Sequence, residues 1–212
     1  MLQLVSSLDR LGTESAFEVL ARADALQRQG KSIINLGIGQ PDFKTPAHIV
    51  EAAIKALLDR HHGYTPAQGI LPLREAVARD LKRRHGVGVH PDTIVIWPGG
   101  KPTMFFSILI FGQPGAEILY PDPGFPIYRS MIEFSGAKAV PIVQNEGNEF
   151  SFTADQVLSL ITPKTGLIIL NSPGKPCGGA AGKEEIEKLV AGLERFPNVA
   201  IMSDEIYGQM LY

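Results

Sequence analysis

In the second half of the sequence, short apolar runs alternate with helix-like segments, and this alternation limits the fold more than any other feature. The runs have strand length and comprise residues 93–97, 116–120, 137–143, 166–170 and 199–203. Strands that alternate with helices are typical of an α/β fold with a mostly parallel sheet and helices on both faces. We therefore expect a three-layer α/β/α arrangement.

Apolar residues at helical spacing, with helix stop signals, predict three earlier helices within residues 14–30, 46–60 and 72–86. The third is expected to end at Gly86, because glycine readily adopts the left-handed conformation that closes a helix. Helical or loop segments separate the later apolar runs, at residues 101–111, 126–136, 153–161 and 182–196. The first 45 residues look like an arm that leads into the main domain.

Composition excludes several classes of partner. The net charge of −2 offers no electrostatic footprint for nucleic acid or an anionic membrane. No apolar run approaches the roughly 18 residues that a membrane span needs. Cys177 is the single cysteine of the sequence, so no internal disulfide framework is possible. We expect a cytoplasmic protein with no membrane, nucleic-acid or metal partner.

Four junctions between a predicted strand and the following segment carry polar, aromatic or glycine residues, and ligands of parallel sheets gather at such junctions. Gly99 and Gly100 follow the first run, where a helix start suits an anion. Two glycines in such a turn more often serve only the turn. Phe125 and Tyr128 follow the second run and could present a flat aromatic face or simply fill the core.

The other two junctions carry an amine and carboxylates. Asn171, two prolines, small residues and Lys175 follow the fourth run, and Asp204 ends the fifth, with Tyr207 three residues later. A strand-end aspartate is more often a helix cap than a catalytic group. Taken together, the residues at the four junctions are better explained by one shared ligand than by four unrelated structural roles. A phosphate, a flat ring, a cationic ring nitrogen held by a buried carboxylate, and a ring oxygen are the features of pyridoxal 5′-phosphate.

The sequence resembles the class I/II aminotransferases of the fold-type I pyridoxal-phosphate superfamily, and is similar to their aspartate and kynurenine aminotransferase branches. The resemblance runs from about residue 10 to the last residue and rests on the motifs "NLGIGQPDF", "YTPAQGILPLREAVA", "PGGKPTMF", "PDPGFPIY", "NSPGKPCGG" and "SDEIYGQMLY". It implies an aminotransferase that moves an amino group between an amino acid and a 2-oxo acid. It also implies a homodimer with shared active sites.

The resemblance further implies which residues contact the phosphate and the substrate. Gly99, Gly100 and Lys101 occupy the family's phosphate-binding turn. Tyr64 matches the tyrosine that reaches the phosphate of the neighbouring subunit's cofactor. Gly39 lies where the family's backbone meets the substrate α-carboxylate.

Three further residues match those that hold the cofactor ring. Phe125 matches the ring that stacks on the pyridine, Asp204 the aspartate paired with the pyridinium nitrogen, and Tyr207 the tyrosine bonded to the 3-oxygen. Asp204 and Tyr207 are the candidate catalytic residues. Lys175 departs from the pattern, because it stands where the family has an asparagine on the 3-oxygen. We expect its ammonium to face that oxygen and to weaken ordinary catalysis; a solvated loop lysine is the alternative.

A second departure is length. The family's Schiff-base lysine lies beyond the "SDEIY" motif, and this sequence stops at Tyr212. The family sheet has the strand order 3-2-4-5-6-7-1, and only its first five strands are present, so the strand at 93–97 lacks a neighbour. By the resemblance, residues 1–45 form the N-terminal arm and part of the small domain, and residues 46–212 the cofactor-binding large domain, incomplete at its C-terminal end. We expect part of a longer enzyme; the alternatives are a lyase or synthase of the same superfamily, or a non-catalytic fragment or pseudoenzyme.

Overall fold

The computed structural model describes residues 3–12, 15–37 and 39–210 and divides the chain into two compact units. One unit combines Met1–Ser15 with Gly100–Tyr212, and the other is Ala16–Gly99. The boundary near residue 45 between an arm and a large domain stays a prediction.

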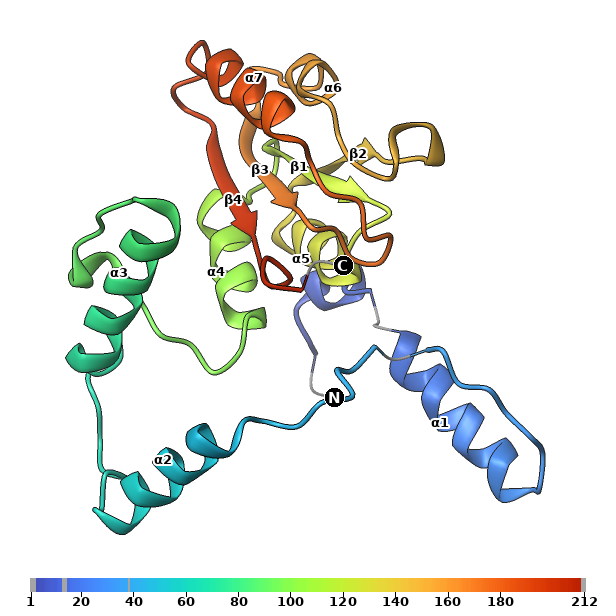
Figure 1. Cartoon of the computed structure of the whole chain (residues 1–212). Coiled ribbons are helices and arrows are strands. Elements are labelled where there is room, and N and C mark those ends of the chain that lie inside the picture. Colours follow the sequence, from blue (N-terminus) through green and yellow to red (C-terminus); the bar gives the residue numbers. More distant parts are fainter. Residues whose placement is uncertain (1–2, 13–14, 38, 211–212) are drawn as a thin grey trace. The chain divides into compact units, whose positions relative to one another are not determined.

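A four-stranded parallel sheet forms the centre of the first unit (Figure 1). Its strands are β1 (Glu117–Asp122), β2 (Lys138–Val143), β3 (Thr165–Asn171) and β4 (Ala200–Asp204), in the spatial order β2-β1-β3-β4. All three pairs of neighbouring strands run parallel. The parallel sheet is therefore confirmed, and so is the 3-2-4-5 part of the predicted strand order.

Helices cover both faces of this sheet, as the alternation of apolar runs predicted. Helices α4 (Lys101–Phe111) and α5 (Pro126–Ser135) lie on one face, and α6 (Ala154–Ser159) and α7 (Lys183–Leu193) on the other (Figure 1). Successive residues of β1 point to opposite faces, so Ile118 joins the core cluster of α4 and α5, while Leu119 joins that of α6 and α7. The three-layer α/β/α arrangement is confirmed.

The strand predicted at residues 93–97 is wrong. A short 3-10 helix, η2 (Pro91–Thr93), begins this segment, and residues 94–97 belong to no strand. The Ile96 amide donates to the Gln68 carbonyl at 2.9 Å, which is an isolated bond rather than a ladder. Since a strand exists only when another strand pairs with it, an apolar run without such a neighbour remains an extended segment.

The second unit is built from helices. Its elements are α1 (Ser15–Arg28), α2 (Ala47–Leu58), α3 (Leu71–His85) and η2. The three predicted helices are confirmed, and α3 ends at Gly86, whose φ of 72° is left-handed as expected.

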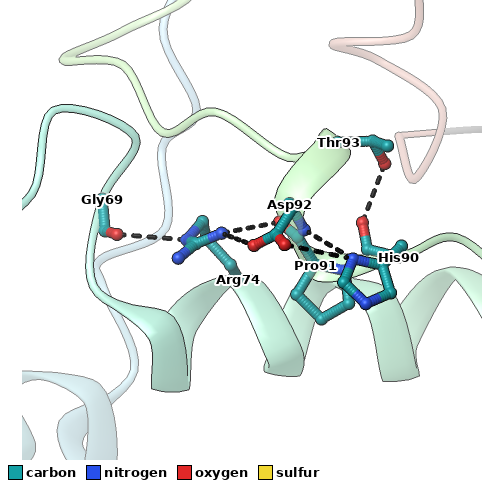
Figure 2. A network of polar contacts seen from close by, with 6 residues as sticks. All are labelled: Gly69, Arg74, His90, Pro91, Asp92 and Thr93. Carbon is teal, nitrogen blue, oxygen red and sulfur yellow. Dashed lines mark hydrogen bonds and ion pairs between the residues drawn. The ribbon is translucent and has the colours of Figure 1, made fainter.

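Arg74 of α3 is the most deeply buried of the described residues of this second unit, with 8% of its surface exposed. Its guanidinium donates to the carbonyl oxygens of Gly69 and Pro91 and to the carboxylate of Asp92, all at 3.0–3.1 Å (Figure 2). These bonds tie α3 to the turn that precedes it and to η2.

Two 3-10 helices complete the first unit. The first, η1 (Ser6–Arg10), places Arg10 so that its guanidinium donates to the Glu133 carbonyl at 2.8 Å, which attaches the N-terminal segment to α5. The second, η3 (Glu146–Asn148), follows β2. None of the described helices combines the length and the apolar character that crossing a bilayer requires.

Candidate active site

A cavity of about 320 Å³ opens in the first unit beside the carboxyl ends of β3 and β4 and the start of α4. Its volume is at the lower end of the range for small-molecule sites, roughly 300–1,000 Å³. Eight residues that the sequence singled out line it together: Gly100, Lys101, Phe125, Tyr128, Asn171, Lys175, Asp204 and Tyr207. These residues come from four separate segments of the chain, which the parallel sheet brings to one edge.

The start of α4 forms one wall. Gly99 has a φ of 89°, a left-handed conformation that a side chain would strain, and Gly100 is the N-cap residue of the helix. The first turn of a helix has amide groups without intrahelical partners and a partial positive charge. Lys101 adds a full positive charge at the same place, so this wall suits an anion.

Phe125 is the residue just before α5, and it lines the cavity. The Nζ atom of Lys175 lies 4.8 Å from the centroid of this ring, and the Nζ atom of Lys101 lies 5.8 Å from it. Both distances are within reach of a cation–π attraction. The aromatic surface thus lies beside two ammonium groups, although the lysines are far apart in sequence.

Asp204 ends β4 and also lines the cavity, and hydrogen bonds hold both of its carboxylate oxygens. Oδ2 accepts the hydroxyl of Tyr128 at 2.5 Å, and Oδ1 accepts the amide of Ile206 at 3.3 Å. The second bond is the local turn that a strand-end aspartate often makes. The sequence predicted a buried carboxylate, and this is wrong, because Asp204 is only half-buried and faces the cavity.

Tyr128 is completely buried, and its phenol stays protonated. Burial raises the pKa of Tyr128 well above its ordinary value, and the hydrogen bond to the Asp204 carboxylate and that group's charge raise it further. Sequence reasoning treated Tyr128 only as an aromatic face or a core residue and missed this contact. The available signal was its spacing, one helical turn after Phe125 at the start of α5.

Asn171 fixes the loop after β3, as the sequence suggested. This buried side chain donates from Nδ2 to the Asp204 carbonyl at 2.9 Å and accepts the Lys175 amide on Oδ1 at 2.8 Å. It therefore connects the ends of β3 and β4 with the start of the loop. Lys175 is exposed, as a solvated loop lysine would be, yet it also lines the cavity.

The remaining predicted site residues belong to the second unit. Gly39, Tyr64 and Gly99 lie within Ala16–Gly99, and Tyr64 is fully exposed. Their roles towards substrate, a neighbouring subunit and phosphate stay predictions.

Groups of both charge signs line the cavity. Lys101, Lys175 and the start of α4 supply positive charge, Asp204 and Glu205 supply negative charge, and Phe125 offers a flat face beside both lysines. This set of charged and aromatic groups suits a planar ligand that carries an anionic group at one end and a cationic ring atom elsewhere. The chemistry of the lining therefore fits pyridoxal 5′-phosphate.

Comparison with known proteins gives matches over most of the chain. The sequence model of the family "Aminotransferase class I and II" matches residues 31–212. An aspartate/prephenate aminotransferase of Nitrosomonas europaea is 35% identical over 91% of this chain and 49% of its own length. A probable aspartate aminotransferase of Methanocaldococcus jannaschii is 40% identical over 84% of this chain and 47% of its own length.

A solved structure agrees with these sequence matches. The crystal structure of the aspartate aminotransferase from Rhizobium meliloti superposes with a TM-score of 0.93 and 31% identity, over 100% of this chain and 53% of that one. The chain spans about half the length of the curated relatives it matches.

Proposed function

Because this chain belongs to the class I and II aminotransferase family, we propose that it takes part in a pyridoxal-phosphate-dependent transfer of an amino group between an amino acid and a 2-oxo acid. The observation that carries the proposal is the shared cavity. Residues singled out in four separate segments of the chain line one space, with charges of both signs in the same lining.

The proposed assignment of cofactor groups follows the charges. The phosphate would bind at the start of α4 beside Lys101, and the ring would stack on Phe125. Asp204 would accept a hydrogen bond from the protonated pyridine nitrogen, and Tyr207 and Lys175 would contact the 3-oxygen. When bound, the protonated pyridine ring withdraws electrons from the substrate bond that breaks.

The chain's own residues would orient and polarise that ring. An ionised carboxylate at Asp204 favours the protonated ring nitrogen, because opposite charges stabilise each other. Phe125 would fix the plane of the ring, and the first turn of α4 would hold its phosphate in place. These contacts would act together to present one face of the ring to the substrate.

The second unit would supply contacts to substrate and to a partner. We assign the substrate α-carboxylate to the backbone at Gly39, and the phosphate of a neighbouring subunit's cofactor to Tyr64. Full exposure leaves the Tyr64 phenol open to such a contact. This assignment makes the active protein a homodimer, and a cytoplasmic location accords with such an enzyme.

The proposal is tested by a transamination screen of the protein expressed from its complete gene, against a panel of amino and keto acids. In that protein Asp204→Asn should lower turnover by about 10²–10³-fold, because the neutral amide no longer stabilises the charged ring nitrogen. Asp122→Asn is the matched control. Asp122 also ends a strand of the same sheet, but it is exposed and lines a different cavity.

Near-normal turnover of Asp204→Asn would remove Asp204 from the site. Release of ammonia or of a side-chain fragment, without transfer of the amino group, would identify a lyase instead. No turnover and no binding of pyridoxal phosphate would leave a non-catalytic member of the family.

A further inference from the structure

Tyr128 contacts two walls of the cavity at once. Its hydroxyl donates to Asp204 Oδ2 at 2.5 Å, although the two residues are 76 positions apart in the sequence. Its ring meets that of Phe125 edge to face, with centroids 5.9 Å apart and an interplanar angle of 84°. One buried side chain therefore touches both the residue proposed to stack on the cofactor ring and the residue proposed to bind its nitrogen.

The direction of the hydrogen bond is settled by the chemistry of the pair. A carboxylate can only accept, and burial together with the Asp204 charge keeps the phenol protonated by raising its pKa. Tyr128 is thus a permanent donor to Oδ2, while the Ile206 amide donates to Oδ1. Two donors from different segments limit the rotation of the Asp204 carboxylate about its last side-chain bond.

Core packing alone would not require this geometry. Tyr128 belongs to the apolar cluster between the sheet and helices α4 and α5, and a phenylalanine would fill the same space. A buried phenol does need a hydrogen-bond acceptor, and the acceptor of the Tyr128 hydroxyl is the single carboxylate of β4.

We propose that Tyr128 is a positioning residue, which aims the Asp204 carboxylate at the ring nitrogen of the cofactor. This inference rests on the proposed function and adds to it a residue that acts through Asp204. Its effect must therefore pass through Asp204 and depend on the ring nitrogen, and both dependences can be measured.

The test uses binding of pyridoxine phosphate, which carries the ring, the nitrogen and the phosphate but no aldehyde, so that no covalent bond contributes. Tyr128→Phe should weaken its binding to the protein expressed from its complete gene about tenfold. Tyr120→Phe is the matched control. Tyr120 is also buried in the same cluster, but it lines a second cavity, which Asp204 does not line. It should bind the probe as the unaltered chain does.

A 1-deaza analogue of the probe, in which carbon replaces the ring nitrogen, separates positioning from packing. Tyr128→Phe should change the binding of this analogue about twofold or less, and in an Asp204→Asn background it should cause no further loss for either probe. Tyr128→His, whose ring can also donate to a carboxylate, should recover part of the discrimination between the two probes. Circular dichroism of each variant verifies that the fold is kept.

Each outcome bears on one claim. Equal binding of pyridoxine phosphate by Tyr128→Phe and the unaltered chain overturns the inference and leaves the proposed function intact. Equal loss for both probes, or loss that persists in the Asp204→Asn background, also overturns it, because Tyr128 would then act through packing alone. Failure of the unaltered chain to bind either probe would instead count against the proposed function.

Discussion

Replacing Arg74 by methionine should open the region around η2, because the guanidinium bonds to Pro91 and Asp92 of η2 and also to Gly69 in the turn before α3 (Figure 2). Methionine keeps the apolar stem and a similar helix propensity, so the change isolates the charged head. The carbonyl oxygens of Gly69 and Pro91 each lose a charged donor, which costs about 1–1.5 kcal/mol per bond. The bond to Asp92 adds at most about 0.5 kcal/mol, since that carboxylate is 68% exposed.

The expected loss is therefore about 3 kcal/mol in the free energy of local opening, or roughly a 150-fold faster exchange of the protected amides. Mass spectrometry of hydrogen exchange measures this at the amides of Ile94 and Ile96, which bond to Pro91 and Gln68. Fluorescence of Trp97, the single tryptophan, gives a second readout in the same segment.

Arg79→Met is the matched control. Arg79 lies on the same helix, but its side chain is 71% exposed and makes only a long ion pair with Glu75, at 4.0 Å. It should change exchange by no more than about twofold. If Arg74→Met exchanged no faster than Arg79→Met, the three bonds of Arg74 would contribute nothing net, and the reasoning would be refuted.

Two further predictions concern the first unit. The pKa of Glu117 is lowered, mainly by a hydrogen bond from the hydroxyl of Thr162 at 2.6 Å and then by Lys138 at 3.0 Å. The ionised carboxylate therefore stabilises the folded unit above the unfolded pKa of about 4.3, and this stabilisation is lost as the pH falls through the lower folded pKa. Glu117→Gln should therefore destabilise the unit by about 1 kcal/mol at pH 7, and thermal unfolding should show this difference shrinking below about pH 4. Lys175→Asn should raise by roughly one unit the pH at which the absorbance of bound cofactor changes, because a positive charge near the ring oxygen is removed, and it should increase turnover. An unchanged titration and turnover would make Lys175 a solvated loop residue.

Local sequence patterns predicted most elements of this fold, because burial on one or both faces leaves a period in the sequence. The run 166–170 became β3 (Thr165–Asn171), and the pattern of 72–86 became α3 (Leu71–His85). The run 93–97 has the same apolar character, yet it forms no strand, since pairing depends on a neighbour that no local pattern records. Val95 and Trp97 remain substantially exposed as a result.

The site was predictable in its residues more than in its contacts. Asp204 and Phe125 were identified at strand ends, where a parallel sheet presents ligand-binding groups. The hydrogen bond from Tyr128 to Asp204 joins α5 to β4, and only the packing of that helix on the sheet reveals it. The ammonium of Lys175 lies 4.8 Å from the Phe125 centroid for the same reason, because the loop after β3 returns towards the start of α5.

A crystal structure of the chain with pyridoxal phosphate bound tests the central claim most directly. The account predicts the phosphate at the start of α4 beside Lys101, the ring against Phe125, and the pyridine nitrogen within hydrogen-bond distance, about 2.7–2.9 Å, of the Asp204 carboxylate. A cofactor bound with its nitrogen away from Asp204, or outside this cavity, would contradict it.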